Sequence, residues 1–174
     1  MSNGYITGGG FAALFDSYEH TAFRLEVRKS YLGVPYEQER FARFLAGEDD
    51  EAQRSRPWLT EVRRRAGEGK TMTRVRVVDH PATDYVRYAY QAAVANIAAG
   101  EDIRYLDRSA ATDLPAYDFW LFDSSRLYLM HYTEDDESLG AEEVTDPGRI
   151  LQHAYYRDAA WHFALPHQQF SLTN

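Results

Sequence analysis

Residues 73–106, TRVRVVDHPATDYVRYAYQAAVANIAAGEDIRYL, decide the fold. At their start, valines alternate with arginines and then run on as an apolar pair, which is typical of a strand entering a sheet. Pro81 opens a helix over 84–98, whose apolar residues recur at helical spacing until Gly100 ends it. Residues 102–106 then form a short second strand. A strand–helix–strand unit of this kind predicts parallel pairing of its two strands.

The second informative stretch is YDFWLFDSSRLYLMHY, residues 117–132. Two apolar runs, 118–122 and 127–132, surround a short polar turn, so we expect a β-hairpin. A third strand is expected over 138–144. Strands of a hairpin pair antiparallel, because a short turn reverses the chain direction.

The rest of the chain supplies one more strand, over 22–28, and the helices that cover the sheet. Helical spacing predicts these helices over the ranges 11–15, 37–45, 58–66 and 147–165. The sequence therefore predicts a single α/β domain over 11–174, with a mixed, mostly antiparallel sheet flanked by helices. Residues 1–10 are polar and rich in glycine, and we expect them to be a mobile leader.

The composition excludes several kinds of chemistry. The 174 residues contain no cysteine, which excludes disulfides, zinc–thiolate sites, iron–sulfur ligation and a thiol nucleophile. A net charge of −8 opposes direct nucleic-acid binding, and we expect the basic cluster Arg63–Arg65 to be the solvated face of a helix. The sequence shows no secretory signal and no apolar run as long as a membrane span, so we expect a cytoplasmic protein without membrane attachment.

Several segments together resemble a known group of proteins: FDSYEHTAFRLEVR (15–28), RVRVVDHPATDYVRYAY (74–90), GEDIRYL (100–106), YDFWLFD (117–123) and DAAWHFALPH (158–167). They resemble an uncharacterised actinobacterial domain family of stand-alone proteins, which are often encoded beside helix-turn-helix regulators. The resemblance covers nearly the whole chain. It implies a regulatory context and carries over no activity.

The order of elements up to Asp123 is also similar to one half of a phospholipase D-like domain. Active members of that class carry the motif HxKxxxxD, in which the histidine is the phosphoryl-accepting nucleophile and the lysine binds phosphate. With Asp123 as the aspartate of the motif, Ala116 holds the histidine position and Asp118 the lysine position. A methyl group cannot attack phosphorus, and a carboxylate repels phosphate. The resemblance therefore implies a phospholipase D-like half-domain without its catalytic residues.

The strongest candidate site lies on the first predicted strand. There, Arg24, Glu26 and Arg28 share one face, so that two guanidiniums flank a carboxylate. Such a group can clamp an anionic ligand through charge-assisted hydrogen bonds, with Glu19 nearby and His20 as a proton donor. The alternative is an ion-paired surface strand with a capping histidine.

A second candidate begins the helix of the strand–helix–strand unit, at Asp84, Tyr85 and Arg87. In parallel α/β sheets, ligands lie at the carboxyl ends of the strands, where this helix starts. The alternative is that Thr83 or Asp84 simply caps the helix.

On the hairpin, Asp118, Trp120 and His131 are expected to reach one another across the strands. No spacing of histidines fixes two ligands on one element, so we expect no metal and no cofactor. On the last helix, Asp158 and His162 lie four residues apart on an otherwise apolar face. A half-buried pair of this kind can orient an imidazole for acid–base chemistry, or it can satisfy itself in the core.

These observations lead to two hypotheses. The first is a non-catalytic accessory or regulatory protein that binds a protein partner, a helix-turn-helix regulator, together with a small ligand. The alternative is an enzyme acting on a small molecule with a phosphate or carboxylate group, with His20 or His162 as the acid–base residue and Arg24 as the clamp. The sequence leaves the ligand and the oligomeric state open, including a homodimer.

Overall fold

The computed structural model describes residues 4–173. Its helices and strands follow in this order: α1 (Gly8–Ser17), β1 (Thr21–Glu26), α2 (Pro35–Leu45), α3 (Glu51–Arg54), α4 (Pro57–Gly67), β2 (Thr71–Val78), α5 (Asp84–Ala99), β3 (Glu101–Asp107), β4 (Phe119–Phe122), β5 (Arg126–Tyr132), β6 (Ser138–Val144), α6 (Pro147–Phe163) and β7 (Leu165–Pro166). Short 3₁₀ turns follow β3 and β7. Every helix and strand expected from the sequence is present, with ends that differ by a few residues.

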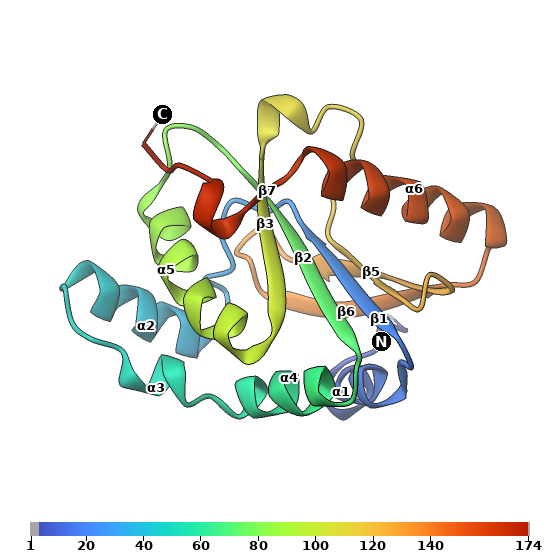
Figure 1. The fold of residues 1–174 in the computed structure, drawn as a ribbon, viewed down its shortest axis with the longest axis horizontal. Coiled ribbons are helices and arrows are strands. Elements are labelled where there is room, and N and C mark those ends of the chain that lie inside the picture. Colours follow the sequence, from blue (N-terminus) through green and yellow to red (C-terminus); the bar gives the residue numbers. More distant parts are fainter. Residues whose placement is uncertain (1–3, 174) are drawn as a thin grey trace.

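The described strands form one seven-stranded sheet in the order β6-β5-β4-β1-β2-β3-β7 (Figure 1). β2 pairs in parallel with both of its neighbours, β1 and β3. The other neighbouring strands pair antiparallel. The predicted α/β fold, with a mixed, mostly antiparallel sheet flanked by helices, is confirmed.

The unit β2–α5–β3 forms as predicted. The parallel register of β2 and β3 runs from the pair Met72 and Glu101 to the pair Val78 and Asp107. At the start of α5, the Thr83 hydroxyl accepts a hydrogen bond from the backbone N–H of Val86 at 3.2 Å, so Thr83 caps this helix. At its end, Gly100 adopts the left-handed region with φ 113°.

The two faces of the sheet have different covers (Figure 1). Along β1, Phe23 and Leu25 point to one face and Arg24 and Glu26 to the other, because side chains alternate on a strand. α6 packs on the first face, where Ala160 contacts the apolar core, and we call this the α6 face. α1, α4 and α5 lie on the opposite face, which we call the pocket face.

The N-terminal end differs from the prediction. Residues 1–3 of the expected leader lie outside the described residues. α1 begins at Gly8 rather than at Phe11. Ile6 forms an antiparallel bridge with Ala141 of β6, with N–H···O distances of 2.8 and 2.9 Å. The second half of the expected leader therefore pairs with the sheet and starts a helix.

Two short elements are absent from the sequence prediction. α3 follows the acidic run at 48–51, which predicts only the end of the preceding helix. Asp50 begins α3 by accepting a hydrogen bond from the Gln53 backbone N–H at 3.1 Å. At the other end of the chain, α6 stops at Phe163, and Leu165–Pro166 form β7 beside β3.

The predicted half-buried face of α6 is wrong. Leu151 and Tyr155, which share that face, are 58% and 66% exposed. The helix instead turns His153 and Ala160 to the sheet, where both are buried. In the part of the chain that the structure describes, no helix is both long and apolar enough to cross a membrane.

Candidate ligand-binding site

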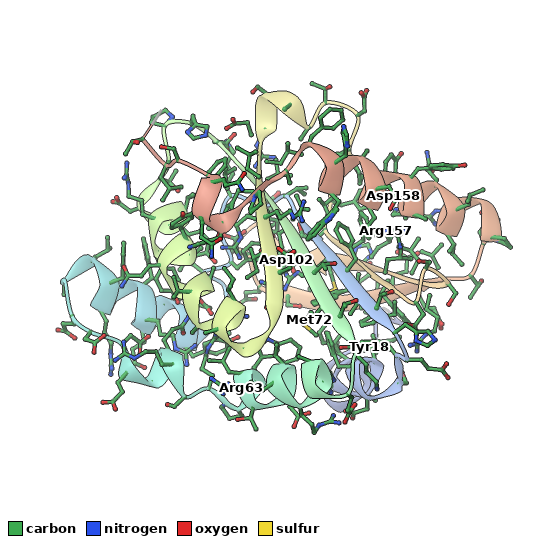
Figure 2. The ribbon with its side chains drawn as sticks, in the orientation of Figure 1. Tyr18, Arg63, Met72, Asp102, Arg157 and Asp158 are labelled. Atoms are coloured by element: carbon green, nitrogen blue, oxygen red, sulfur yellow. The ribbon has the colours of Figure 1, made fainter. Side chains whose placement is uncertain are left out.

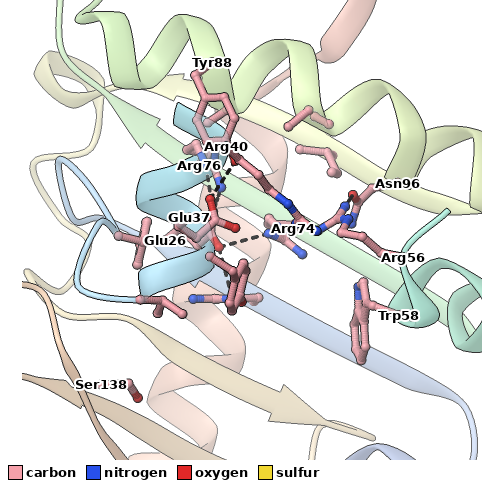
Figure 3. A pocket seen from close by; sticks show the side chains of 18 of the residues that line it. Glu26, Glu37, Arg40, Arg56, Trp58, Arg74, Arg76, Tyr88, Asn96 and Ser138 are labelled. Carbon is pink, nitrogen blue, oxygen red and sulfur yellow. Dashed lines mark hydrogen bonds and ion pairs between the residues drawn. The ribbon is translucent and has the colours of Figure 1, made fainter. Parts of the chain in front are cut away.

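A cavity of about 600 Å³ lies on the pocket face of the sheet (Figure 3). β1 and β2 form its floor, and α1, α2, α4 and α5 contribute side chains to its walls, together with β4 and β5. The lining combines arginines and carboxylates with tyrosine, tryptophan and phenylalanine rings. This volume falls in the range of small-molecule sites.

The floor of the cavity is organised around the carboxylate of Glu26, which is 2% exposed. Its Oε1 lies 3.1 Å from Arg24 Nη1 and accepts a hydrogen bond from Arg74 Nη1 at 3.0 Å. Arg76 Nε donates to Oε2 at 2.7 Å. Burial acts to raise the pKa of Glu26, but these arginines outweigh burial and hold it well below its ordinary value. Glu26 is therefore a fixed negative charge.

The prediction that Arg24 and Glu26 share one face of β1 is confirmed. Arg28 extends from the same side but does not flank Glu26. It pairs with Asp136 at the margin of the cavity, and its guanidinium lies 4.8 Å from the ring centre of Tyr132. The additional guanidiniums around Glu26 come from the neighbouring strand β2.

A second buried carboxylate, Glu101 of β3, extends this network towards α5 and α4. It accepts hydrogen bonds from Arg74 Nε at 2.8 Å and from Asn96 Nδ2 at 2.7 Å. Asn96 Oδ1 in turn accepts a hydrogen bond from Arg56 Nη2 at 2.6 Å, and Figure 3 shows Arg56 beside Asn96. The floor and one wall of the cavity are thus joined by hydrogen bonds.

Arg56 differs from the floor arginines because its hydrogen bonds go to neutral groups. Besides Asn96, it donates through Nε to the backbone carbonyl of Gln53 at 3.2 Å. Within residues 4–173, no carboxylate lies within ion-pair distance of its guanidinium. Burial lowers the pKa of Arg56, and the positive charge of Arg40 lowers it further. Among the described residues, Arg56 is thus a half-buried cation with no contacting counter-charge.

Buried polar atoms without a hydrogen-bond partner occur on several residues of the cavity wall. Among the described residues, these atoms are Arg24 Nε, Arg40 Nη1, Gln53 Oε1 and Trp120 Nε1. Buried polar groups are normally paired, because leaving one unpaired costs about 1–3 kcal/mol. These four atoms are available to hydrogen-bond a polar ligand in the cavity.

Tyrosines supply neutral hydroxyls to the wall. Tyr88 donates to Glu37 Oε2 at 2.8 Å. Burial raises the pKa of Tyr85 and Tyr88 far above the usual phenol value, and it raises the pKa of Tyr132 to about 12. These hydroxyls stay protonated; that of Tyr88 already donates to Glu37 and remains an acceptor for a ligand.

Asp118 lies directly behind this wall and is 1% exposed. Its carboxylate accepts hydrogen bonds from the Val27 backbone N–H at 2.8 Å and from the Tyr31 hydroxyl at 2.6 Å. Burial raises the pKa of Asp118, although Arg24 Nη2 at 3.7 Å acts in the opposite direction. Asp118 therefore orients two wall residues, Tyr31 and Arg24.

The structure brings together about half of the residues predicted for the site. Those that line the cavity, or pair with residues that line it, are Arg24, Glu26, Arg28, Tyr85, Asp118 and Trp120.

Glu19 and His20 lie away from the cavity. Their side chains are 81% and 79% exposed and approach each other only to 3.9 Å. They precede β1 rather than belonging to it, so the chain turns them to solvent at the strand end. The expected role of His20 beside Arg24 therefore has no support in the geometry.

His131 does not reach Asp118 or Trp120. Alternation along β5 places it on the α6 face with Leu129, whereas Trp120 lies on the pocket face. His131 Nε2 lies 2.8 Å from Glu142, and its ring stacks on Tyr5. The expected cross-strand group is wrong because it ignores this alternation.

The remaining predicted residues are exposed. Asp84 and Arg87 face solvent on the first turn of α5, on the side away from Tyr85. Asp158 and His162 face solvent on α6, and Asp158 pairs with its neighbour Arg157 (Figure 2). In the described residues, Asp158 and His162 share no hydrogen bond, so the expected half-buried pair does not form.

The sequence prediction missed several site residues: Arg40, Gln53, Arg56, Arg74, Arg76 and Asn96. The arginines of β2 were visible as an alternating pattern, which indicates a polar face without saying what covers it. For Arg56 and Gln53 the sequence carries no comparable signal, because they lie in an irregular segment around α3.

Histidine and carboxylate side chains do not gather into a metal site: no group of three or more that could hold a metal ion occurs within residues 4–173. Among the described residues, the unpaired buried atoms of the cavity lining are chiefly nitrogen donors of arginine and tryptophan, which suit ligand oxygens rather than a cation.

Comparison with known proteins gives one assignment. None of the curated proteins matches the chain. A family model does match, and it covers residues 9–172, which is nearly all of the sequence. The match spans every element that builds the cavity. The chain therefore belongs to the family described as Domain of unknown function (DUF6879).

Proposed function

We propose that the protein is a non-catalytic accessory protein whose cavity binds a small molecule with a carboxylate or phosphate group. The observation that carries this proposal is Arg56, a half-buried cation in the cavity wall with neutral hydrogen-bond partners. Arg24, Arg74 and Arg76 of the floor are offset by Glu26 and Glu101, whereas Arg56 is not offset by a contact of this kind. A ligand anion there gains charge-assisted hydrogen bonds in a partly shielded site.

Two neighbours extend Arg56 into an anion subsite, which we define as Arg40, Gln53 and Arg56. Arg40 Nε lies 3.8 Å from Asp50, and its Nη1 has no partner among the described residues. Gln53 is 8% exposed, and its Oε1 is also unpaired among them. The subsite can therefore bind anion oxygens through Arg40 and Arg56 and accept one hydrogen bond from a ligand through Gln53.

The geometry supports binding more than catalysis. Glu26 is held ionised by its arginines, so it is a weak base, and Asp118 is occupied by Tyr31 behind the wall. The enzyme alternative relies on His20 or His162, and both side chains are exposed and outside the cavity lining. The geometry therefore offers neither of these two histidines to a ligand in the cavity.

The second part of the proposal is that the protein acts in the cytoplasm by binding a helix-turn-helix regulator. It rests on the resemblance to regulator-associated actinobacterial proteins, and the apolar side chains exposed on α6, such as Tyr155 and Phe163, suit a protein contact. A pull-down from native lysate with the intact chain tests it. Stoichiometric recovery of a helix-turn-helix protein supports this part, and a preparation without one contradicts it.

A distant relation to phospholipase D-like domains is part of the same proposal. It is supported by the order of the elements and by Asp123 at the end of the apolar strand β4. In this chain Asp123 accepts backbone hydrogen bonds from Glu19, His20 and Thr21 rather than facing the cavity. This use of the aspartate agrees with a scaffold that does not carry out phosphoryl transfer.

Isothermal titration with inorganic phosphate, and separately with acetate, tests anion binding. Low ionic strength is used because salt screens such contacts. We expect saturable binding of at least one anion and a tenfold or greater loss in Arg56→Gln. Arg63→Gln is the matched control, because Arg63 is exposed on the same helix and carries the same charge. Equal binding by wild type and Arg56→Gln, or absence of binding to wild type, contradicts the proposal.

A further inference from the structure

A second set of unpaired donors lies in the same cavity, on the floor strand β1 and on the wall strand β4. Arg24 of β1 and Trp120 of β4 are direct partners in the antiparallel register. The Arg24 guanidinium carbon lies 5.4 Å from the Trp120 ring centre. Arg24 Nε and Trp120 Nε1 are both buried and have no hydrogen-bond partner among the described residues. We call these two residues the donor pair.

The donor pair differs from the anion subsite in its charge balance. Arg24 lies 3.1 Å from Glu26 and 3.7 Å from Asp118, so its positive charge is already offset. Trp120 is neutral and only 2% exposed. The two N–H groups therefore lack hydrogen-bond acceptors, whereas the charge of Arg24 is already balanced. A neutral acceptor such as a carbonyl oxygen satisfies such donors without adding a buried charge.

The two subsites are attached to different strands of the sheet. Trp120 is on β4, and Arg56 is joined through Asn96 to Glu101 on β3. Three inter-strand steps separate the backbones of β4 and β3, which corresponds to about 14 Å at the usual spacing of about 4.8 Å. A molecule that extends across β1 and β2 can therefore contact both subsites.

The wall next to the donor pair is aromatic. Phe15 packs edge-on against Trp120 and Trp58, with ring centres 4.9 and 5.0 Å apart. Phe15, Trp58 and Trp120 all line the cavity, and Trp58 lies two residues after Arg56 in the chain. Rings in this arrangement favour a flat, apolar group on the ligand.

We propose that the ligand is an extended molecule with an anionic group at one end and a planar, carbonyl-bearing group at the other. The anion binds the anion subsite, and the carbonyl oxygen accepts hydrogen bonds from Arg24 Nε and Trp120 Nε1 beside the aromatic wall. This inference rests on the proposed function, because it assigns the second end of a ligand whose first end is the anion.

The first test follows the indole N–H resonances of the intact protein by NMR during titration with benzamide, a neutral, planar carbonyl compound. The sequence has three tryptophans, and Trp120→Phe identifies the Trp120 resonance. We expect that resonance to move downfield in a saturable way. The Trp161 resonance is the internal control, because Trp161 packs against Arg104 on the α6 face and stays in place. An unmoved Trp120 resonance, with phosphate still bound, overturns the inference and leaves the proposed function intact.

The second test uses two acids of matched length, 6-benzamidohexanoate and 8-phenyloctanoate, in isothermal titration. Both have a ring at one end and a carboxylate at the other, but only the first has a carbonyl group next to the ring. We expect 6-benzamidohexanoate to bind wild type at least tenfold more tightly. Trp120→Phe should remove most of that difference, and Arg56→Gln should weaken the binding of both acids alike.

Circular dichroism shows whether Trp120→Phe folds. If it does not, the ratio of the affinities of the two acids for the wild type decides the inference by itself. Equal affinities for the two acids overturn the inference. Binding of both acids that is unaffected by Arg56→Gln overturns the proposed function instead. The two failures are therefore distinguishable.

Discussion

Asp123 holds His20 by its backbone and not by its imidazole: Asp123 Oδ1 accepts the His20 N–H at 2.8 Å, while the imidazole lies in solvent. The same carboxylate accepts the N–H groups of Glu19 at 2.8 Å and Thr21 at 2.9 Å. Asp123 has a positive φ of 51° in the turn between β4 and β5. It therefore fixes the entry of β1, the strand that carries Arg24 and Glu26 into the cavity.

Asp123→Asn should lower the free energy of unfolding by about 1–2 kcal/mol, because an amide oxygen replaces a charged acceptor of several N–H groups. Although burial opposes it, hydrogen bonding by the backbone N–H groups lowers the pKa of Asp123. The stabilisation is thus present above the unfolded pKa of about 3.9 and is lost as the pH falls through the folded value. Urea unfolding at several pH values measures both effects. His20→Ala is the control and should change stability by less than about 0.5 kcal/mol.

Glu26→Gln should be strongly destabilising, by about 3–5 kcal/mol, because it leaves Arg24, Arg74 and Arg76 without their shared counter-charge. Glu39→Gln removes the same charge from an exposed pair with Arg43 and should cost less than about 0.5 kcal/mol. Denaturant unfolding of the two variants gives the comparison. Similar losses in both variants would show that the buried network contributes little.

His153 should make stability depend on pH in the neutral range. It is 1% exposed, with Nδ1 at 2.7 Å from the Arg149 carbonyl and Nε2 at 3.1 Å from the Tyr117 hydroxyl. Burial lowers the pKa of His153, so the unfolded chain takes up the proton first. The contribution to stability is present above the unfolded pKa of about 6.5 and declines as the pH falls below it.

Urea unfolding between pH 8 and pH 5 checks this dependence. His153→Gln should flatten the profile, and His162→Gln should leave it unchanged, because His162 is exposed. An imidazole of His153 that titrates near 6.5 by NMR would contradict the prediction.

Gly100→Ala should lower the free energy of unfolding by about 1–2 kcal/mol. Gly100 has φ 113°, and a Cβ at this position would lie 2.8 Å from the Ala66 side chain of α4. Gly67→Ala is the control, because a Cβ there meets no atom within 4 Å and α4 gains helix propensity. The melting temperature should therefore fall in Gly100→Ala and rise in Gly67→Ala. A loss of equal size in both would contradict the role of the Gly100 conformation.

The longer elements of the fold could be predicted because each carries a local signal, whereas the short α3 and β7 were not predicted. The alternation of valine and arginine in β2 and the helical spacing in α5 depend only on neighbouring residues. The cavity could not be predicted in the same way. Arg56 and Trp120 line one cavity only because α4 packs on the sheet that contains β4. No sequence pattern tells that these two residues come together.

The errors in the site have the same origin. Arg24 and Glu26 were predicted together because a strand places alternate residues on one face. His20 was added because it is close in sequence, yet β1 begins only at Thr21. His131 was added from the hairpin pairing, although it lies an odd number of residues from Tyr128, the partner of Trp120. Proximity in sequence is a weaker guide than the parity of positions on a strand.

The bridge between Ile6 and Ala141 has a consequence for how the molecule behaves in concentrated solution. β6 is the last strand on its side of the sheet, and a terminal strand with free N–H and C=O groups invites another chain to pair with it. By pairing with Ala141, the segment before α1 satisfies the backbone groups of that residue and leaves fewer free groups on this edge for another chain. Loss of the bridge would therefore expose more of β6 to intermolecular β-pairing.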